Sequence, residues 1–492
     1  MRLLASLLLL ASTASAAPAT GIGTAHPVRL LDASPDGRWA AICEARVDTN
    51  KDGAIAVGPG FNGIYGDQMA AFLVTGAGPG IELDDYIDRD PTGRWVVIMR
   101  KAKLVLLDTK TNRDVDLSAL GAYSNPARDP SGAYLGVSFT GTHLAYVAVR
   151  NAKLLVAVRD LVAGTEVTID PGPGKLWSIA FAPSGARVLV EVLPIHADPK
   201  VAIKFPSHRR PGMFRDPRCI TRTYSDSITI TGDDPVMRIA ATSGGTALDV
   251  PGYITTIGDA TVRRDPKGAI FLDDAKGAHE LLPAACTGVV RRVNASKGRL
   301  LARCKAKGDA APLLLVSVGS VKDLGVPSGN STDDYDAPFG RHVFSSTSDA
   351  DDTITDLDTG KRRVVKFNQR DHASLGDRTL VSRHLRLIML DGPGETDLGA
   401  ITTEYPEVLS AGTVRYIAPF VVDMATGKLL GMAPRREMPW NGDSKYTTTV
   451  SPSVLAVAAD GRMLATYALK PSGYPDGPLE WITPVAVPKP TK

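Results

Sequence analysis

The stretch Ser34-Pro-Asp-Gly-Arg-Trp39 leads directly into the apolar run Ala40-Ala-Ile-Cys43. Proline fixes φ at about −65° at the second position of a tight turn, and glycine adopts the positive φ that ends the turn. A short apolar run after such a turn is typical of a buried strand. The stretch therefore predicts two strands joined by a tight turn.

This turn recurs along the chain, each time before a run that favours β-structure. The further copies are Asp90-Pro-Thr-Gly-Arg-Trp95, Asp129-Pro-Ser-Gly-Ala133, Ala182-Pro-Ser-Gly-Ala186, Asp265-Pro-Lys-Gly-Ala269 and the degraded Ala459-Asp-Gly-Arg462. A repeat of this kind indicates one structural unit used many times.

A second repeated unit follows these turns, in which a strand runs into a turn with Asp at its start and is followed by another strand. Asp can accept a hydrogen bond from the backbone two residues on, and Gly or Asn supplies the positive φ. The copies begin at Leu104-Val-Leu-Leu-Asp108, Leu313-Leu-Leu-Val316, Ile354-Thr-Asp-Leu-Asp358, Leu385-Arg-Leu-Ile-Met-Leu-Asp391 and Phe420-Val-Val-Asp423.

One unit of each kind gives roughly four strands, and radial repetition of four-stranded sheets is the signature of a β-propeller. We expect an all-β fold, a propeller of about seven or eight four-stranded blades, in a single domain over 17–492. A long insertion is expected around 194–226. We expect Val28–Leu31 to lie beside Trp481–Val487 and close the ring. A β-sandwich or a pair of β-solenoids is the open alternative.

The N-terminus has the three parts of a secretory signal. Met1-Arg2 is the positive start, Leu3–Leu10 is the apolar core, and Ala14-Ser-Ala16 is a small-residue cleavage site, so residues 1–16 are expected to be removed. No Cys follows the apolar run to carry a lipid anchor, and no later stretch approaches the roughly 18 apolar residues of a membrane span. We expect a periplasmic or secreted protein.

The four cysteines of an exported chain are candidates for disulfides. Cys286 and Cys304 are the best pair, because each lies in a β-like run and the loop between them is short. Closing such a loop contributes roughly 3 kcal/mol in the chain-entropy model. Cys43 and Cys219 are left either as a second, long-range pair or as two buried thiols.

The turn, the apolar strand and the Leu-x-Asp-x-x-Thr-Gly hairpin together resemble the repeats of TolB-like bacterial β-propellers. The resemblance is most specific at residues 34–39, 90–117 and 129–132. The chain departs from WD-type repeats because it lacks Trp-Asp dipeptides, and from kelch repeats because it has a single Gly-Gly. The resemblance implies the fold and a periplasmic setting, and fold alone implies no activity.

The stretch Asp48-Thr-Asn-Lys-Asp-Gly-Ala-Ile55 resembles the first half of an EF-hand calcium loop. The closing carboxylate of an EF-hand should fall at position twelve, which is Pro59, so Asp67 would have to complete the shell from elsewhere. The alternative is a polar hairpin tip whose side chains cap turns. The candidate ligands of a structural Ca²⁺ are Asp48, Asn50, Asp52, the carbonyl of Ala54, and Asp67.

Motifs for catalysis are missing from the sequence. It has no Gly-x-Ser-x-Gly elbow and no His-Glu-x-x-His zinc helix, and its eight His are scattered. A formal net charge of +3 is too small to indicate the basic surface of a nucleic-acid-binding protein. The loop Phe205–Cys219 carries Arg, Phe and Met, which are residue types of interface centres, although a solvated insertion is the open alternative.

We therefore expect a non-enzymatic scaffold for protein–protein interaction, with no catalytic residues assigned. The partner is an unidentified protein, nucleic acid and membrane spans are not expected, and the chain is expected to be a monomer. The alternative is a calcium-dependent, lactonase-like hydrolase whose metal ligands are dispersed around a central funnel.

Overall fold

The structure is a computed structural model, and every structural statement below concerns the residues that it describes. These are residues 21–22, 28–47, 68–75, 80–123, 136–193, 236–283, 290–294, 299–303, 313–317, 320–324, 341–347, 350–365, 369–401, 408–440, 443–467 and 479–487. Within these ranges there is no helix long and apolar enough to span a membrane.

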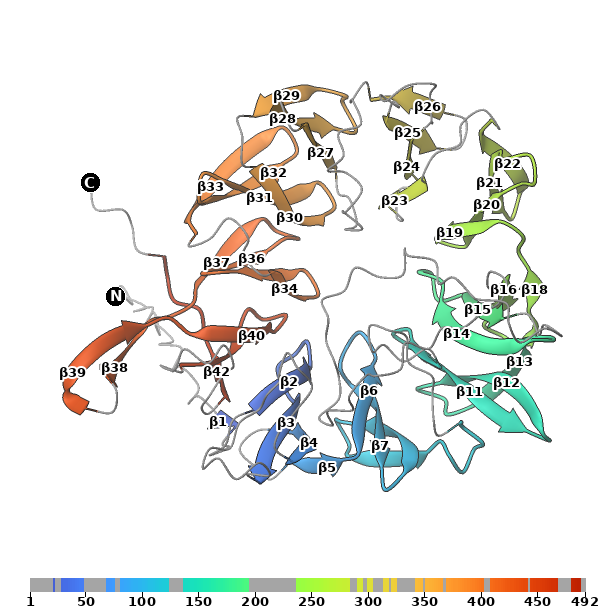
Figure 1. Cartoon of the computed structure of the whole chain (residues 1–492), viewed down its shortest axis with the longest axis horizontal. Coiled ribbons are helices and arrows are strands. Elements are labelled where there is room, and N and C mark those ends of the chain that lie inside the picture. Colours follow the sequence, from blue (N-terminus) through green and yellow to red (C-terminus); the bar gives the residue numbers. More distant parts are fainter. Residues whose placement is uncertain are drawn as a thin grey trace, which may run out of the picture.

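The described residues form ten sheets of three to five strands and one separate hairpin. Figure 1 shows the sheets arranged radially around a centre, with the first strand of most sheets on the inside and the last strand at the rim. Consecutive strands within a sheet pair antiparallel, as in β6–β7–β8–β9. The chain is therefore an all-β protein with the architecture of a β-propeller.

The first five sheets follow the chain order. β2–β5 are Val28–Ala33, Ala40–Val47, Gln68–Val74 and Ile81–Leu83; β6–β9 are Asp85–Arg89, Trp95–Arg100, Lys103–Asp108 and Arg113–Asp116; β10–β13 are Val137–Phe139, His143–Arg150, Lys153–Asp160 and Glu166–Asp170. β14, β15, β16 and β18 are Lys175–Phe181, Arg187–Leu193, Val236–Ala241 and Leu248–Asp249; β17 (Gly245–Thr246) joins the previous sheet, parallel to β13; β19–β22 are Tyr253–Ile257, Ala260–Arg264, Ile270–Asp274 and Gly277–Leu282.

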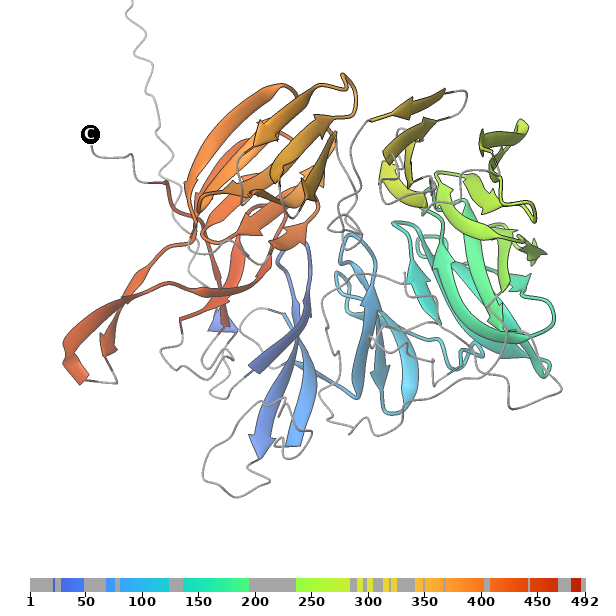
Figure 2. The same ribbon diagram turned by 45° about the horizontal axis from the view of Figure 1, so that its top comes forward.

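The remaining strands complete the ring. β23–β26 are Val290–Asn294, Arg299–Arg303, Leu313–Ser317 and Ser320–Asp323; β27–β29 are His342–Thr347, Ala350–Asp356 and Arg362–Val365; β30–β33 are Gln369–Leu375, Arg378–Arg383, Arg386–Asp391 and Gly394–Ala400. β34–β37 are Val408–Ala411, Val414–Ile417, Phe420–Asp423 and Lys428–Met432; β38–β39 are Arg436–Trp440 and Asp443–Val450; β40–β42 are Ser453–Val457, Met463–Thr466 and Leu479–Ile482, and β1 is Gly21–Ile22. The hairpin β38–β39 extends away from the ring (Figure 2).

The repeated turn joins the first and second strands of a sheet at 34–37, 90–93, 182–185 and 458–461, as predicted. In the copy at 265–268 it joins the second and third strands instead, β20 and β21. The copy at 129–132 lies outside the described residues.

The described residues form more sheets than the expected seven or eight blades. The sequence pattern missed some of them because they lack the repeated turn. In β30–β33 and β34–β37 the first two strands are joined by the two-residue turns Gly376-Asp377 and Gly412-Thr413. Their glycines adopt positive φ of 58° and 54°. A tight hairpin of this kind needs no proline.

The ends of the chain meet in one sheet, where β1 pairs antiparallel with β42 through Gly21↔Glu480 and Ile22↔Leu479. The prediction that the two ends close the ring is confirmed, but the prediction that Val28–Leu31 provides the N-terminal strand is wrong. Those residues belong to β2, which pairs with β3 in the next sheet. This strand leads into the Ser34 turn, and the local hairpin that the turn forms makes β3 its neighbour.

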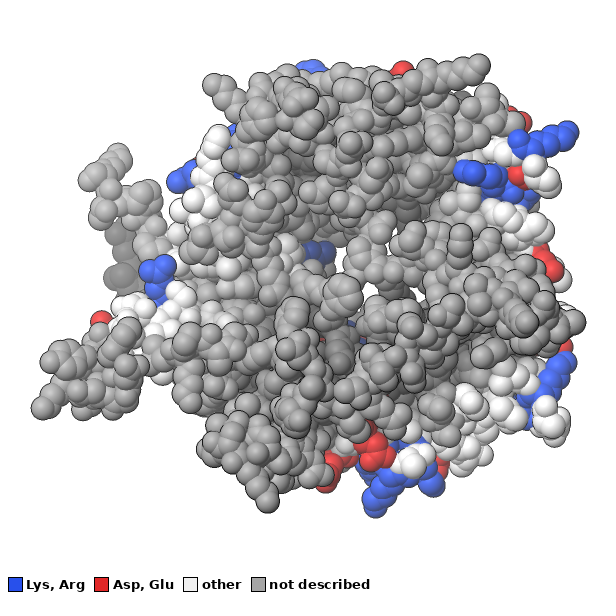
Figure 3. Space-filling view, viewed as in Figure 1, with Lys and Arg blue, Asp and Glu red and all other residues white. Residues whose placement is uncertain are grey.

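The hydrophobic cores lie between neighbouring sheets. One cluster combines Trp39, Ala41 and Leu73 of β2–β5 with Val96 and Leu107 of β6–β9. Other clusters join β6–β9 to β10–β13, and β10–β13 to β14–β18. Charged side chains of both signs lie at the rim among the residues coloured in Figure 3. Apolar residues of adjacent sheets are thus buried face to face, and the turns at the ends of these seams carry the polar groups.

Candidate functional site

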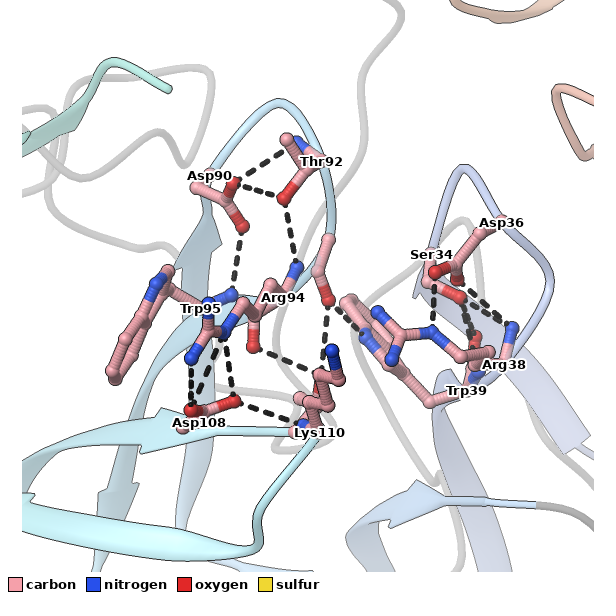
Figure 4. A network of polar contacts seen from close by, with 12 residues as sticks. Ser34, Asp36, Arg38, Trp39, Asp90, Thr92, Arg94, Trp95, Asp108 and Lys110 are labelled. Atoms are coloured by element: carbon pink, nitrogen blue, oxygen red, sulfur yellow. Dashed lines mark hydrogen bonds and ion pairs between the residues drawn. The ribbon is translucent and has the colours of Figure 1, made fainter. Parts of the chain in front are cut away.

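The turns at 34–37 and 90–93 begin with different residues, Ser34 and Asp90, whose side chains both accept hydrogen bonds from the backbone of their own turn (Figure 4). The hydroxyl oxygen of Ser34 accepts hydrogen bonds from the backbone N–H groups of Arg38 and Trp39, at 2.7 and 3.0 Å. The carboxylate of Asp90 accepts from the N–H of Trp95, at 2.7 Å. Each first residue therefore satisfies amides inside its own turn, as Ser and Asp do in turns generally.

Trp39 links its own turn to the turn of the next sheet. Its ring is buried, and its indole N–H donates to the carbonyl oxygen of Gly93 at 2.6 Å. The Thr109 hydroxyl donates to the same oxygen at 3.2 Å. Gly93 has a φ of +75°, and a Cβ added there would lie 2.7 Å from Cδ of Pro35. The two turns are consequently in direct contact, and the seam between these sheets is closed.

The same turn also contacts the last sheet of the chain. The backbone N–H of Ala459 donates to the carbonyl of Pro35 at 2.5 Å, and the Arg462 guanidinium donates to the carbonyl of Asp36 at 3.0 Å. The Arg462 guanidinium also lies 5.5 Å from the ring centroid of Trp481. These contacts support the ring closure that β1 and β42 make.

An Arg–Asp pair lies beside the turn at 90–93. Arg94 donates to both carboxylate oxygens of Asp108, with its closest approach at 2.8 Å, and the N–H of Lys110 donates to the same group at 3.0 Å. Burial raises the pKa of Asp108, but these hydrogen bonds outweigh burial and hold the pKa below its usual value. Asp108 is thus an ionised residue that both starts its turn and fixes Arg94.

The backbone identifies the equivalent residues in four other sheets. The N–H of the residue after the turn-starting Asp always donates to one carbonyl across the hairpin, such as that of Arg94. We call the residue with this carbonyl the cross-strand position. The five pairs of cross-strand residue and Asp are Arg94 with Asp108, Thr142 with Asp160, Arg341 with Asp356, Asp377 with Asp391, and Thr413 with Asp423.

Four of the five Asp residues accept hydrogen bonds from side chains on the neighbouring strand. Arg341 pairs with Asp356, Arg378 with Asp391, and the hydroxyl of Thr413 donates to Asp423 at 2.8 Å. In the unit predicted to start its turn at Asp358, this function belongs to Asp356, whose carboxylate accepts from the N–H of Asp358 at 2.9 Å.

Asp160 is different from the other four. Its carboxylate accepts from the N–H groups of Ala163 and Val162, both at 2.7 Å, and these bonds lower its pKa. Among the described residues no side chain donates to it. The cross-strand residue Thr142 uses its hydroxyl for Nδ1 of His143 instead, at 2.8 Å.

A groove of about 350 Å³ opens beside Asp160, between β10–β13 and the turns of the next sheet. We call it the junction groove. Its described lining residues are His143, Val158, Asp160, Thr165, Glu166, Val167, Gly185, Ala186, Thr242 and Ser243. The volume lies at the lower end of the roughly 300 to 1,000 Å³ typical of ligand pockets.

The groove exists because small residues stand where the first seam has large ones. Ala186 follows the turn glycine Gly185, in the place that Arg94 takes after Gly93. Thr242 donates its hydroxyl to the carbonyl of Gly185 at 2.7 Å, as Thr109 does to that of Gly93. The backbone frame is therefore shared, and the side chains alone leave this seam open.

The second carboxylate of the junction groove, that of Glu166, is bound by side chains of its own sheet. Glu166 accepts from the hydroxyl of Tyr146 and forms an ion pair with Arg150. Burial, followed by the hydrogen bond to Glu166, raises the pKa of Tyr146 well above its usual value. Glu166 thus neutralises charge inside its own sheet, which leaves Asp160 as the carboxylate available to a ligand.

The residues proposed from the sequence as a metal site and a disulfide fall outside the described residues. They are Asp48, Asn50, Asp52, Ala54 and Asp67 of the calcium loop, and Cys286 and Cys304. The loop Phe205–Cys219 lies outside them as well. Cys43 is buried and takes part in a disulfide. No group of three His, Cys, Asp or Glu that could hold a metal is present in the described ranges.

Sequence reasoning missed the junction groove. The turn that precedes His143 is Thr140-Gly-Thr142, which has no proline and so does not match the repeated turn. The spacing to the turn-starting Asp also hides the equivalence, because Thr142 precedes Asp160 by 18 residues, whereas Arg94 precedes Asp108 by 14 and Arg341 precedes Asp356 by 15.

No protein-family model matches the chain, and no curated protein matches it. Among solved structures, the chain is similar to the β-propeller domain of the trilobed protease from Pyrococcus furiosus, at 11% identity and a TM-score of 0.30, over 77% of this chain and 99% of that one. It is also similar to dipeptidyl peptidase 4 from Porphyromonas gingivalis, at 11% identity and a TM-score of 0.36, over 81% of this chain and 64% of that one. TolB from Acinetobacter baumannii matches at 13% identity and a TM-score of 0.22, over 65% of each chain. The chain spans less than two thirds of these last two proteins, and what it shares with all three is a resemblance in fold.

Proposed function

We propose that this chain is an exported β-propeller that acts as a non-enzymatic scaffold for protein–protein interaction. The observation that carries the proposal is the junction groove, an open seam lined by hydroxyls, an imidazole and two carboxylates. Another described seam of the ring, by contrast, is closed by Trp39. A polar groove held on rigid sheets can receive a side chain of a partner at little cost in ordering.

The rest of the turn network supports a structural use of the charged residues. Arg94, Arg341 and Arg378 are each held by an Asp of the same sheet, and Arg462 binds the carbonyl of Asp36 in the neighbouring turn. These groups stiffen the ring and present a fixed surface. Preorganised surfaces of this kind need little rearrangement on binding.

Photo-crosslinking tests the scaffold proposal directly. A photoreactive amino acid replaces Ser243 in the junction groove, and in a matched control it replaces Lys110, which holds the same place after Thr109 that Ser243 holds after Thr242. We expect one protein to be cross-linked from the Ser243 position in living cells, and the Lys110 position to give none or a weaker product. Absence of any cross-linked protein from both positions and from a set around the turns would contradict the scaffold.

A structural calcium ion at Asp48, Asn50, Asp52, Ala54 and Asp67 is part of the proposal. A ligand bound only by the folded state raises stability by about 2.7 kcal/mol at a hundredfold excess over Kd. We expect calcium to raise the unfolding temperature relative to EDTA, and Asp52→Ala to remove the effect. Equal unfolding temperatures with calcium and EDTA would dismiss the metal and leave the scaffold untouched.

A further inference from the structure

We propose that the junction groove binds the guanidinium group of an arginine side chain on the partner protein, with Asp160 as its carboxylate. This inference rests on the proposed scaffold function and gives its partner a chemistry. The chain itself provides the template, since the same carboxylate in two other sheets is occupied by an arginine from the cross-strand position.

The first step is that Asp160, unlike Asp108 and Asp356, has no arginine paired with its carboxylate among the described residues. In the sheets of Asp108 and Asp356, Arg94 and Arg341 approach the carboxylate to 2.8 and 2.9 Å. The backbone bonds from Leu161 to Thr142 and from Thr109 to Arg94 show that Thr142 occupies the equivalent position. Among the described residues no Lys or Arg forms an ion pair with Asp160, and the basic side chain opposite it across the hairpin is His143, whose charge contributes to the lowered pKa of Asp160.

The second step is the geometry of the carboxylate. The two backbone N–H groups of its turn both donate to Oδ1 of Asp160. At Asp108 the N–H of Lys110 also uses Oδ1, and Arg94 still reaches both oxygens, at 3.2 Å for Oδ1 and 2.8 Å for Oδ2. A turn-starting Asp of this repeat therefore accepts a forked guanidinium while it caps its own turn.

The third step is the space and lining beside Asp160. In the neighbouring turn Ala186 follows Gly185, where Arg94 follows Gly93 in its own turn, and a groove of about 350 Å³ lies beside this short side chain. Val167, which is 39% exposed, offers apolar surface to the methylene stem of an arginine, which packs well on such residues. The hydroxyls of Thr165 and Ser243 lie in the lining as further hydrogen-bond acceptors.

These features favour arginine over lysine. A guanidinium presents several N–H donors in a plane and can bind a carboxylate and nearby hydroxyls together, whereas an ammonium is a compact point charge. Arginine is also among the residues that contribute most energy at protein interfaces. An arginine that enters the junction groove would thus anchor a partner segment there.

The test uses short fluorescent peptides, Gly-Ser-Arg-Ser-Gly and its counterparts with lysine or with citrulline, the uncharged isostere of arginine. Their affinities for the full chain are measured by ligand-detected NMR. A hydrogen bond to a charged group typically changes affinity by about tenfold or more, so we expect the arginine peptide to bind about tenfold more tightly than the citrulline peptide. We expect the lysine peptide to fall between them.

Two variants identify the site, and each has a matched control in another sheet. Asp160→Asn keeps an oxygen for the N–H groups of Val162 and Ala163 but removes the charge, and Asp423→Asn is its control. Thr142→Arg supplies the guanidinium from within, as Arg94 does for Asp108, and Thr413→Arg is its control. We expect Asp160→Asn and Thr142→Arg to abolish the preference for the arginine peptide, and the controls Asp423→Asn and Thr413→Arg to retain it. Thermal unfolding confirms that each variant is folded.

The outcomes separate this inference from the scaffold itself. Equal binding of the arginine and citrulline peptides, or a preference that persists in folded Asp160→Asn, would overturn the arginine site. If cross-links from the Ser243 position were still found, the scaffold would stand with a different partner chemistry. If the arginine preference appeared without any cross-linked protein, the groove would bind the cation and the scaffold would fail.

Discussion

Two seams of this ring share a backbone frame and differ in what fills them. Between β2–β5 and β6–β9, Trp39 reaches across to the carbonyl of Gly93, and Arg94 lies on Asp108. Between β10–β13 and β14–β18, the corresponding arginine positions hold Thr142 and Ala186, and a groove of about 350 Å³ remains.

The difference teaches that a repeat can change the side chains that line a seam without changing its backbone. In both seams a threonine hydroxyl donates to the carbonyl of the turn glycine, which is Gly93 in one and Gly185 in the other. The turn positions are thus set by the same bonds. Thr142 and Ala186 follow their turn glycines where Arg38 and Arg94 do in the closed seam, and the open seam has a charged wall at Asp160.

The largest expected effect comes from opening the closed seam. Trp39→Ala removes a buried indole from a core shared by two sheets and leaves the carbonyl of Gly93 with the Thr109 hydroxyl alone. Large-to-small changes of this type cost about 3–5 kcal/mol. We expect a clear fall in the urea midpoint of unfolding, and a smaller fall for the half-buried Trp95→Ala. Equal losses in both variants would contradict the special role of Trp39.

A smaller effect is expected where the two turns touch. Gly93→Ala combines a positive φ of 75° with a Cβ placed 2.7 Å from Cδ of Pro35. Backbone strain of about 1–2 kcal/mol adds to overpacking, which typically costs about 1–3 kcal/mol. Gly258→Ala is the matched control, because it also has a positive φ, of 58°, but no atom within 4 Å of the added Cβ. We expect thermal unfolding to show the larger loss at Gly93, and an equal loss would show that turn contact is unimportant.

Much of the fold could be predicted because its signals are short in range. The proline and glycine of the turn at Ser34 act within a few residues, and the bond from Lys110 N–H to Asp108 is equally local. The number of sheets was underestimated because β30–β33 and β34–β37 join their first two strands by the two-residue turns Gly376-Asp377 and Gly412-Thr413. These turns lack the proline by which the repeated turn is recognised in the sequence.

The candidate site was harder to predict than the fold. The arginine that completes a turn-starting Asp lies on another strand, 14 residues away for Arg94 and Asp108. Absence of that arginine at Thr142 has meaning only when the register of β11 and β12 is known, with His143 opposite Asp160. The sequence contains the substitution, but the comparison that reveals it requires the sheet.

Acid should weaken a sheet that keeps its Arg–Asp pair. Burial raises the pKa of Asp356, but hydrogen bonds from Arg341 and from the N–H groups of Thr359 and Asp358 outweigh it and lower the pKa from 3.8 to about 2. A folded-state pKa below the unfolded one stabilises the fold above the unfolded value, and this contribution is lost as the pH falls through the folded value. In Asp356→Asn we expect a smaller loss of stability than in the wild type between pH 3.8 and about 2. Urea midpoints along this pH series measure the difference, and parallel curves would contradict it.

The smallest expected effect comes from closing the open seam, and it is the most direct test of the comparison. Thr142→Arg places a guanidinium where Arg94 and Arg341 hold theirs, so it should pair with Asp160. Pairs near the surface contribute little and are screened by salt. We expect a slight rise in the unfolding temperature at low ionic strength that vanishes in concentrated NaCl, whereas Thr142→Gln should show no dependence on salt. If the unfolding temperature of Thr142→Arg stayed raised in concentrated NaCl, the gain would come from packing of the new side chain in the groove and not from its charge. The open seam would then differ from the closed one in shape more than in charge.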